Sequence, residues 1–584
     1  MIRTLDQGGS GIPSRLGRLS ATERRVWLAF TRGEKVDLRV GDAEVDNPAN
    51  ADQWGADRVV RGEVVAALLL GAGPSTAGCV GAVRIAGARI TGELSVDHGR
   101  VAAPLLLQGC LFEGPVNLDE AVTESIDLSG SQLTTLSAYG AHVRGTLDLH
   151  DLVVNGTPER AVHADGITVD GSLIADRIKV TGSLCLINAV IGGQVTLNEA
   201  ELTNAGPEGK ALNAGGMRVG RSLLAKRLVA SGEVRLPGAH IGSALLFDGA
   251  TLTCEGADAF NGGALTVASS AYFRLDEPKG DVPFSAHGTV RLVGARIGGG
   301  LHFTGAQLER IEPVAGAANE GEAPEEQPVI AASGLVVEGS LYLVKGFSTE
   351  GEIRLTGARI TGHLDIREMS SPKALLTLYA ATALGGIRDS LDSWPGRLNL
   401  DGFTYGAFDA YFSPRERLQL LDRMVRRDDA VTVGAYRAQP YEQLAAYYRS
   451  LGNDGDARTV LLAKQRAQRA RLPFWQRLPG HLLDLLVGYG YRPLRAIGWA
   501  VGLMVAGSVY FSEVTPQHVS TEDHSLFNPV LFAADHLVPI IRFGQPEVWQ
   551  YHGLAAVVTV VLTVLGWTLG IAIAAAASRT LTRS

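Results

Sequence analysis

Three polar side chains stand in or beside an otherwise apolar segment near the end of this 584-residue chain: Asp535, His536 and Arg542. The segment, residues 526–541, is too apolar for an ordinary loop. We expect it either to re-enter a membrane or to lie in the outer interface as an amphipathic helix. The Asp535 carboxylate and the His536 imidazole could form a proton or ion site there if several copies assembled. The alternative is that they face water or headgroups, and the sequence leaves both interpretations open.

Other patterns that could do chemistry are weaker. Residues 486–490 reproduce most of a potassium-filter signature, but they precede the first expected membrane span instead of lying between two spans. Residues 71–78 approach a dinucleotide-binding glycine loop, yet β-type repeats follow where that motif needs a helix. The four cysteines form no paired motif, which favours small core residues over metal ligands. The sequence therefore indicates no catalytic residue, no cofactor-binding site and no metal site.

Two uncharged apolar stretches, residues 496–512 and 554–577, predict transmembrane helices. A spanning helix needs about 20 apolar residues, with about 17 as the lower limit, so the second stretch qualifies easily and the first only just. Aromatic residues near the ends of these stretches are placed to anchor at the two membrane interfaces: Trp475, Trp499 and Trp549.

Basic residues set the expected orientation of these helices. Lysines and arginines gather before the first stretch and after the second, whereas the connection 513–552 contains only Arg542. By the positive-inside rule, both termini should be cytoplasmic. The N-terminus also lacks the apolar core of a signal peptide. We therefore expect a multi-pass plasma-membrane protein whose N-terminal body stays in the cytoplasm.

The elements that position these segments begin with a repeat between Val83 and Ile366. It reads V-x-L-x-G-A-x-I-x-G-x-L-x-h, where h is apolar, and copies occupy residues 83–96, 234–247, 290–303 and 353–366. Apolar residues alternate in short runs, as strands with one buried face require, and such runs must stack to bury that face. The expected fold class is mainly β: a right-handed parallel β-helix (solenoid), followed by a helical hairpin and two transmembrane helices.

Changes of pattern divide the chain into four expected regions. A capping box at Ser20 and Glu23 predicts a helix start, and the apolar run 64–70 predicts a buried strand leading into the repeats. Beyond the repeats, residues 441–471 have the pattern of a helix pair. The expected division is an N-terminal helix and solenoid cap at 1–70, the parallel β-helix at 71–410, a helical neck at 411–480 and the membrane domain at 481–584.

Composition narrows the classes of partner. Glycine makes up 71 of the 584 residues, well above the roughly 7% of an average protein, which suits a fold that turns every few residues. The formal net charge of −8 disfavours a nucleic-acid partner, because a phosphate backbone needs a basic surface. Acidic residues of the repeats could act as general acid–base pairs or calcium ligands, or could form a solvated strand face; examples are Asp165, Asp170, Asp176 and Glu199.

Two resemblances add to this reading. The A-x-L and G-A-x-I punctuation of the repeats resembles pentapeptide-repeat proteins and related right-handed parallel β-helices. Over nearly its whole length the chain resembles an actinobacterial family labelled membrane-associated oxidoreductase, on residues 19–27, 394–398, 439–445, 461–465, 488–493 and the segment before Trp549. That label implies redox chemistry, whereas the sequence contains no flavin, nicotinamide, haem, iron–sulfur or paired-thiol motif.

Three functional hypotheses follow. The favoured one is a membrane-anchored cytoplasmic β-solenoid that acts as a scaffold or sensor for a protein partner, because solenoids offer long rigid faces. The first alternative is a two-span, oligomeric ion or proton channel gated by the solenoid. The second is the membrane-associated oxidoreductase that the resemblance implies. The expected partners are the membrane, a protein on the solenoid face and further copies of the chain, but no nucleic acid.

Overall fold

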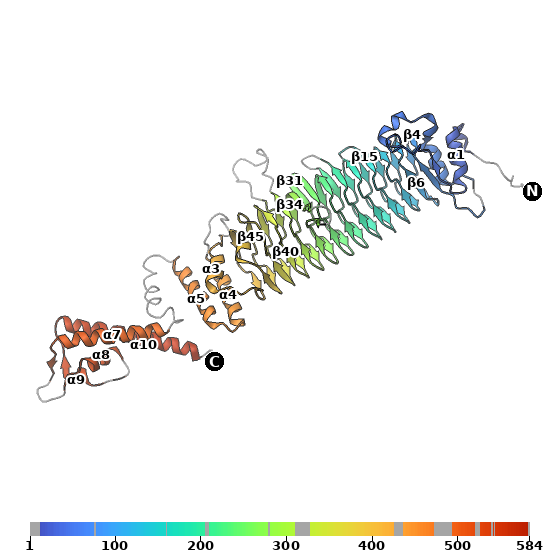
Figure 1. Ribbon diagram of the computed structural model, residues 1–584. Coiled ribbons are helices and arrows are strands. Elements are labelled where there is room, and N and C mark those ends of the chain that lie inside the picture. The colour runs from blue at the N-terminus through green and yellow to red at the C-terminus, as the bar shows by residue number, and fades with distance from the viewer. Residues whose placement is uncertain are drawn as a thin grey trace, which may run out of the picture. The chain divides into compact units, whose positions relative to one another are not determined.

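A computed structural model gives the fold of the chain (Figure 1). It describes residues 12–74, 77–158, 161–204, 209–277, 281–309, 327–425, 436–471, 493–519, 526–538, 541 and 543–581, with the backbone alone at 255–257, 493–496, 572 and 575–581. The chain divides into two compact units, one of residues 1–412 with 419–435 and one of residues 413–418 with 436–584. The first unit contains the repeated β-structure and the second contains the C-terminal helices with one short pair of strands.

The first unit is a parallel β-solenoid of about 13 turns, each called a coil here. Most coils contribute one short strand to sheet A, two to sheet B and one to sheet C. Sheet A extends from β1 (Val36–Asp37) to β47 (Gly386–Arg388), sheet B from β2 (Val59–Arg61) to β48 (Arg397–Asn399), and sheet C from β9 (Val122–Thr123) to β49 (Thr404–Tyr405). The expected parallel β-solenoid is thus confirmed, and its handedness stays a prediction.

The strand register stacks equivalent repeat residues on top of one another. In sheet A, β10 (Ile126–Asp127) pairs with β14 (Leu147–Asp148) in parallel, so that the two first residues and the two second residues are neighbours. The first residue of each of these strands is buried and the second is partly exposed. Successive residues of a strand point to opposite faces, and the alternating apolar residues of the repeat therefore form the interior.

The interior is a packed core of aliphatic and aromatic side chains. Four phenylalanine rings lie with their centroids 5.1 to 5.6 Å from the ring of Phe273, and all five side chains are fully buried; the four are Phe247, Phe260, Phe284 and Phe303. Among the aliphatic side chains from Leu118 to Leu186, the enclosed cavity measures only about 20 Å³, room for about one water. These parts of the solenoid leave no interior space for a ligand.

The corners between strands use the left-handed backbone conformation. Glycine fills many of these positions, for example Gly166 and Gly238 with φ of 68° and 65°. In the described chain, however, twelve non-glycine residues also have positive φ, among them Arg177, Asn188 and Arg227 at 55°. The excess of glycine therefore has the expected cause, because glycine adopts this conformation most easily, but not every corner requires it.

A helix covers the N-terminal end of the solenoid. α1 (Ala21–Phe30) begins at the predicted capping box, where the Glu23 N–H donates to Ser20 Oγ at 3.1 Å and the Ser20 N–H donates to Glu23 Oε2 at 2.8 Å. Glu23 also forms an ion pair with Arg61 of β2 at 2.7 Å. This ion pair ties the helix to the first strand of sheet B.

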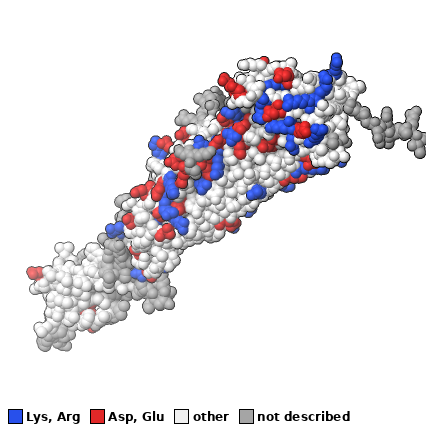
Figure 2. Space-filling view, turned by 45° about the vertical axis from the view of Figure 1, so that its right-hand side comes forward, with Lys and Arg blue, Asp and Glu red and all other residues white. Residues whose placement is uncertain are grey.

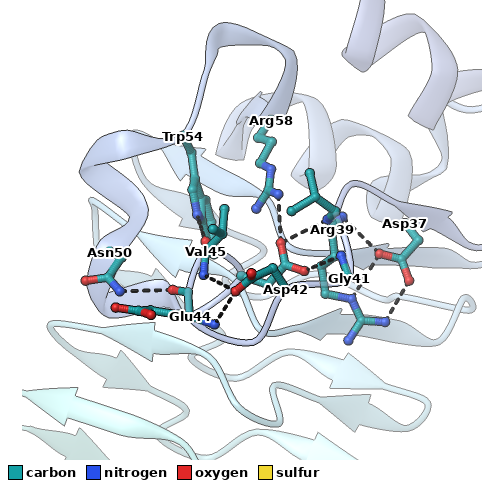
Figure 3. Close-up of polar contacts among 11 residues, drawn as sticks. Asp37, Arg39, Gly41, Asp42, Glu44, Val45, Asn50, Trp54 and Arg58 are labelled. Atoms are coloured by element: carbon teal, nitrogen blue, oxygen red, sulfur yellow. Dashed lines mark hydrogen bonds and ion pairs between the residues drawn. The ribbon is translucent and has the colours of Figure 1, made fainter.

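An irregular loop completes the cap (Figure 3). The Asp46 carboxylate accepts hydrogen bonds from two backbone N–H groups of the loop and pairs with Arg58 at 2.7 Å. The Arg58 guanidinium lies over the Trp54 ring, 4.9 Å from its centroid. Nearby, Arg39 and Asp37 form an ion pair at 2.6 Å. The polar cluster is therefore accounted for by the folding of the cap.

The prediction of a buried strand at 64–70 is wrong. α2 (Gly62–Ala67) continues there into a further helical segment, η4 (Leu68–Ala72). An uninterrupted apolar run has no alternation, so it does not distinguish a buried strand from a buried helix. Gly62 decides the packing, because a Cβ at this position would lie 2.3 Å from the Glu93 carbonyl oxygen. The helix can approach the neighbouring coil this closely only with glycine at that point.

Two helices of the second unit pack against each other across a short connection: α4 (Ala438–Ser450) and α5 (Asp454–Arg469). They follow α3 (Pro414–Leu421), which spans the boundary between the units. Apolar and aromatic side chains of α4 and α5 are buried, including Leu444, Tyr448, Val460 and Leu461.

The remaining described helices are α7 (Pro493–Glu513), α8 (Pro529–Leu537), α9 (Gln545–Val548) and α10 (Leu554–Leu581). A short antiparallel pair, β50 (Gln517–His518) and β51 (Trp549–Gln550), joins the two connections. Of the described helices, only α10 is long and apolar enough to cross a membrane, over Leu554–Ile571. The apolar part of α7, Ile497–Glu513, is shorter, so length and composition support one of the two expected spans.

Candidate functional site

The polar residues of the apolar segment attach α8 to two different parts of the chain. The Asp535 carboxylate accepts hydrogen bonds from the backbone N–H groups of Phe543 and Gln545, the second at 3.0 Å. His536 Nδ1 lies 3.1 Å from Thr563 Oγ1 on α10. Although the two side chains are adjacent in the sequence, each is engaged separately, and both contribute to holding α8 in place.

α8 reaches the middle of α10. The Leu537 carbonyl packs so closely on Gly566 that a Cβ there would come within 2.3 Å of the oxygen. Gly566 lies well inside the apolar stretch Leu554–Ile571. At the other end of α8, the Asn528 N–H donates to the side-chain oxygen of Gln545 at 3.1 Å. The chain therefore descends along α10 to Leu537 and has returned to the level of Asn528 by Gln545.

Aromatic rings gather where α8 begins, with centroid separations of 5.0 to 6.2 Å between neighbours; they are Phe511, Phe527, Phe532, Trp549 and Tyr551. The Tyr551 hydroxyl donates to the carbonyls of Phe511 and Val514, 3.2 and 3.1 Å away. This aromatic cluster fixes the ends of α7 and α10 to the start of α8.

The tryptophans expected to act as membrane anchors have different surroundings in the structure. Trp549 belongs to the aromatic cluster, whereas Trp499 lies near the start of α7 with 43% of its surface exposed. Trp475 and Arg542 lie outside the described residues.

A groove of about 450 Å³ lies between α7 and α10, next to the end of α8. It is lined by apolar residues and glycine, among them Met504, Val538 and Gly570. Such a lining offers no group that could do chemistry.

A second candidate lies on the outside of the solenoid, on sheet A. Its strands β18 (Leu173–Ile174), β22 (Val195–Thr196), β26 (Leu223–Leu224), β30 (Leu245–Leu246), β33 (Ala271–Tyr272), β36 (Leu301–His302) and β40 (Leu341–Tyr342) pair in register. The second residues of these strands point outward and form what we call the sheet A ladder: Ile174, Thr196, Leu224, Leu246, Tyr272, His302 and Tyr342. Six of these seven residues are partly exposed and Thr196 is buried, and none of the seven carries a charge at neutral pH.

Three rings of the ladder stack on one another. The His302 ring lies 4.8 Å from that of Tyr272 and 4.4 Å from that of Tyr342, with interplanar angles of 24° and 11°. Burial, with a smaller contribution from Arg274, lowers the pKa of His302 to about 4. The imidazole is therefore neutral near pH 7, and the ladder remains uncharged there.

Sheet C continues this surface around the next corner. On β21 (Val190–Ile191), β25 (Arg218–Val219), β29 (His240–Ile241), β32 (Thr266–Val267) and β35 (Arg296–Ile297), the outward residues are Val190, Arg218, His240, Thr266 and Arg296. The corners between these strands and sheet A are residues 192–194, 220–222, 242–244, 268–270 and 298–300, which are small except for Gln194 and Arg221. We call the ladder, these outward residues and these corners together the acid-free face, because all of them are described and none is Asp or Glu. The corners of the two flanking coils carry Asp170 and Glu338, which bound the face at its two ends.

Sheet B has the opposite character. Its outward side chains form ion pairs between and within coils, such as Lys179 with Glu201 at 2.8 Å and Arg291 with Asp258 at 2.6 Å. Figure 2 shows the same division: charged side chains gather along the upper side of the solenoid, where Figure 1 places β31 (Thr251–Asn261) and β34 (Ser285–Arg291), and the side below is mostly white. Over the coils from β22 to β36, acidic side chains are therefore absent from sheet A and sheet C and gather on sheet B, whereas in earlier coils sheet A also carries outward carboxylates, such as Asp127 and Asp148.

The sequence predicted outward polar residues but not this sorting. A partial signal lies in the three Ser-Leu elements at 172–173, 222–223 and 340–341, where the next residue is Ile174, Leu224 or Tyr342. The acidic residues that the sequence analysis named as possible acid–base pairs or calcium ligands have a structural role instead. Asp165 and Asp176 accept backbone N–H bonds from the next coil, at 2.8 and 2.9 Å, so they stabilise the stacking of coils.

Metal binding finds no support in the described residues, where no group of three or more His, Cys, Asp or Glu side chains could hold an ion. Cys110 and Cys254 are buried as expected of small core residues, while Cys185 is half-buried and Cys79 is exposed. Burial raises the pKa of the Cys110 thiol to about 12, which keeps it protonated at neutral pH.

Comparisons with known proteins add no further constraint. No protein-family model matches the chain, no curated protein matches its sequence, and no solved structure matches its fold. The resemblance to the actinobacterial membrane-associated oxidoreductase family therefore stays a prediction from the sequence motifs.

Proposed function

We propose that this chain is a membrane-anchored scaffold or sensor whose solenoid binds a protein partner through the acid-free face. The observation that carries the proposal is the contrast between this face and sheet B. Protein interfaces are depleted of Lys, Glu and Asp in their centres and enriched in Tyr and Arg, which is the composition found around Tyr272, Tyr342 and Arg296. A surface whose only task is to stay in solution has no need to exclude carboxylates from two adjacent sheets over five successive coils.

The size of the face is compatible with a specific complex. At a strand spacing of about 4.8 Å, seven coils give the ladder a length of about 29 Å. The five coils of sheet C add about 19 Å, and with each sheet about 10 Å wide the face would offer on the order of 500 Å², somewhat below the roughly 800 Å² per partner of a standard interface. The packed interior supports the same proposal, because it holds the strands of the face rigid before a partner binds.

The anchor in this proposal consists of α7, α8 and α10. α10 supplies a full span, and α8 adds a half-length helix that enters and leaves on one side, at the level of the aromatic cluster. Aromatic rings favour the membrane–water interface, which supports placing this cluster at the outer surface. With the basic residues before α7 inside, the proposal has both termini and the solenoid in the cytoplasm at the plasma membrane.

The test uses the full-length protein expressed in its native membrane. Leu224→Glu combined with Leu246→Glu places two carboxylates in the centre of the sheet A ladder. Val229→Glu is the matched control, since Val229 is 47% exposed on the outer side of β27 (Val229–Ser231) in sheet B. Chemical cross-linking followed by mass spectrometry should recover a partner with the wild type and the control but not with the double variant. An unchanged set of cross-links in the double variant would contradict the proposal.

A second candidate, an oligomeric ion or proton channel gated by the solenoid, is favoured by α8 alone. A helix that stops beside the middle of a spanning helix and returns is an arrangement tolerated only where the returning backbone is buried in protein or lines a cavity. Several copies around one axis would place their α8 segments together. Flux through liposomes, lost in Asp535→Asn, would support the channel, whereas a verified oligomer without flux would remove it.

The oxidoreductase activity implied by the sequence resemblance is tested on the same sample. Purified protein from the native membrane should show bound flavin, haem or nicotinamide by absorbance and mass spectrometry if that chemistry belongs to this chain. A colourless preparation that retains no such group, and that no added cofactor binds, would leave this alternative without support.

A further inference from the structure

Three arginines of the acid-free face have no partner within the part of the chain that the structure describes. Arg218 lies on β25, Arg221 lies three residues later at the corner toward sheet A, and Arg296 lies on β35; all three are exposed. None has an ion pair or side-chain hydrogen bond among the described residues. They are the only residues of the face that carry a permanent charge.

Arginines elsewhere on the solenoid behave differently. Arg177 pairs with Asp151 at 2.7 Å, and Arg274 pairs with Asp248 at 2.8 Å. In a chain with a formal net charge of −8, acidic neighbours are plentiful, so three unpaired guanidinium groups on one acid-free surface form a local positive field. A guanidinium offers a planar set of donors that matches a carboxylate in two-point contact.

The spacing of these groups limits the shape of what they can bind. β25 and β35 are separated by β29 and β32, so Arg218 and Arg296 lie three coils apart in sheet C, about 14 Å at the strand spacing of a solenoid. An extended peptide covers about 13 Å in four residues. Two acidic residues four positions apart on an extended segment would therefore reach both ends of the arginine row.

The neighbouring ladder supplies the apolar part of the same surface. Leu224, three residues after Arg221, begins a run of outward residues on sheet A that continues with Leu246 and Tyr272, parallel to the row of arginines. We propose that the acid-free face binds an extended protein segment in which two acidic residues flank apolar ones, with Arg218, Arg221 and Arg296 pairing with the carboxylates. This inference rests on the proposed scaffold function and names the chemistry of its partner.

Other anionic partners fit the face less well. Attraction to an anionic lipid surface takes clusters of four to eight basic residues, each worth a modest amount, and three arginines spread over about 14 Å fall short of that. A nucleic-acid footprint likewise needs a larger basic stripe than one face of an acidic chain provides. The aromatic rings of the ladder stack face to face along the solenoid, so the faces inside the stack are not free to stack on bases.

The test measures binding of defined probes to the full-length protein in nanodiscs of zwitterionic lipid. The first probe is a fluorescent nine-residue peptide with glutamates at its third and seventh positions and leucine or valine between them. The second has glutamines at those two positions. Vesicles containing phosphatidylserine and a single-stranded oligonucleotide serve as the competing classes of partner.

The variant Arg218→Gln with Arg221→Gln and Arg296→Gln removes the positive row. Arg25→Gln with Arg84→Gln is the matched control, because both residues are exposed and lie outside the face, on α1 and on β3 (Val83–Ala86). We expect the triple variant to bind the glutamate peptide at least tenfold more weakly than the wild type and to lose the salt dependence of binding. The control should bind like the wild type, and the glutamine peptide should bind weakly to all three proteins.

Equal loss in the control, or no loss in the triple variant, would overturn the inference, as would tighter binding of the vesicles or the oligonucleotide than of the glutamate peptide. The two proposals fail separately. In the first case, Leu224→Glu with Leu246→Glu (the ladder variant) abolishes the cross-linked partner while the triple variant leaves peptide binding unchanged. The scaffold proposal is then supported and the acidic partner is ruled out. If the ladder variant also changes nothing, the scaffold proposal fails as well.

Discussion

The solenoid and the C-terminal helices α7 to α10 are held together by different physics. In the solenoid, backbone hydrogen bonds join each coil to the next on three sheets, and side chains only fill the interior or decorate the outside. α7, α8 and α10 satisfy their backbone groups within each helix, so their arrangement depends on a few side-chain contacts, such as Leu537 on Gly566. Regular repetition makes the first region tolerant of outward substitutions, whereas the second depends on single residues.

The largest effect should come from the interior of the solenoid. Phe273→Ala removes a ring that packs against four other buried phenylalanines and leaves a cavity that neighbouring coils cannot close. We expect a loss of about 3–5 kcal/mol in the free energy of unfolding, measured by denaturant titration with far-ultraviolet circular dichroism.

Tyr139→Ala is the control for this substitution, because Tyr139 points outward on the same solenoid and is 49% exposed. Its cost should stay within about 1 kcal/mol. Equal losses for the two variants would mean that the coils are not stabilised by their interior, and the contrast with the helices would disappear.

The next largest effect should come from a single glycine in α10. Gly566→Leu drives a side chain into the Leu537 carbonyl, and a backbone atom cannot move aside as a side-chain tip can. We expect a cost of about 3 kcal/mol, at the upper end for overpacking, and faster hydrogen exchange of α8 by about two orders of magnitude.

Gly502→Leu on α7 is the control, and it tests whether replacing any glycine of these helices by leucine has the same effect on α8. No atom lies within 4 Å of the position that its Cβ would take, so α8 should exchange as in the wild type. Slow exchange of α8 in Gly566→Leu would show that its depth beside α10 is not fixed by this contact.

The same difference explains which features the sequence could predict. The solenoid followed from alternation within the repeat, because each inward residue, such as Leu147 below Ile126, has an equivalent one coil away. The acid-free face was missed because Leu224 follows the inward Leu223, and two adjacent leucines do not reveal which one points outward. Only the register between coils separates them.

The C-terminal helices were predicted from hydropathy, which depends on composition and not on contacts. Hydropathy located α7 and α10 but gave no information on how deep α8 lies, because that depends on Gly566, 29 residues after Leu537 in the sequence. It also overstated α7, whose apolar part is shorter than a full span. The proton or ion site considered for Asp535 and His536 was inferred from their adjacency in the sequence. In the structure, the packing of α8 gives each of them a separate partner.

A smaller effect is expected at the N-terminal cap. There the solenoid depends on individual charged residues, just as the C-terminal helices depend on individual contacts. Burial alone would raise the pKa of Glu23, but hydrogen bonds from Arg61 and from backbone N–H groups outweigh it and leave the pKa below 4.5. The Arg39 guanidinium lowers the pKa of Asp37 to about 2. Both carboxylates are thus more acidic in the folded protein than in the unfolded chain.

A depressed pKa adds stability above the unfolded value, and this stability is lost as the pH falls through the folded value. The cap should therefore loosen between about pH 4.5 and pH 2, seen as cleavage of α1 by an acid-active protease while the central coils stay protected. Glu23→Gln should cost about 1.5 kcal/mol of cap stability at pH 7 and weaken the dependence on pH. An equally steep pH dependence in that variant would assign the effect to other groups.

The smallest effect should come from a corner of the solenoid, at Gly238. Its φ of 65° lies in the left-handed region, and a Cβ there would meet no atom within 4 Å. Asn188, at the equivalent corner two coils earlier, already adopts φ of 55° with a side chain. Gly238→Asn should therefore change the free energy of unfolding by no more than about 0.5 kcal/mol, because asparagine tolerates this conformation and also restricts the unfolded chain. A cost above about 2 kcal/mol would show that the corners need glycine as strictly as α10 needs Gly566, and the two regions would then differ in geometry but not in tolerance.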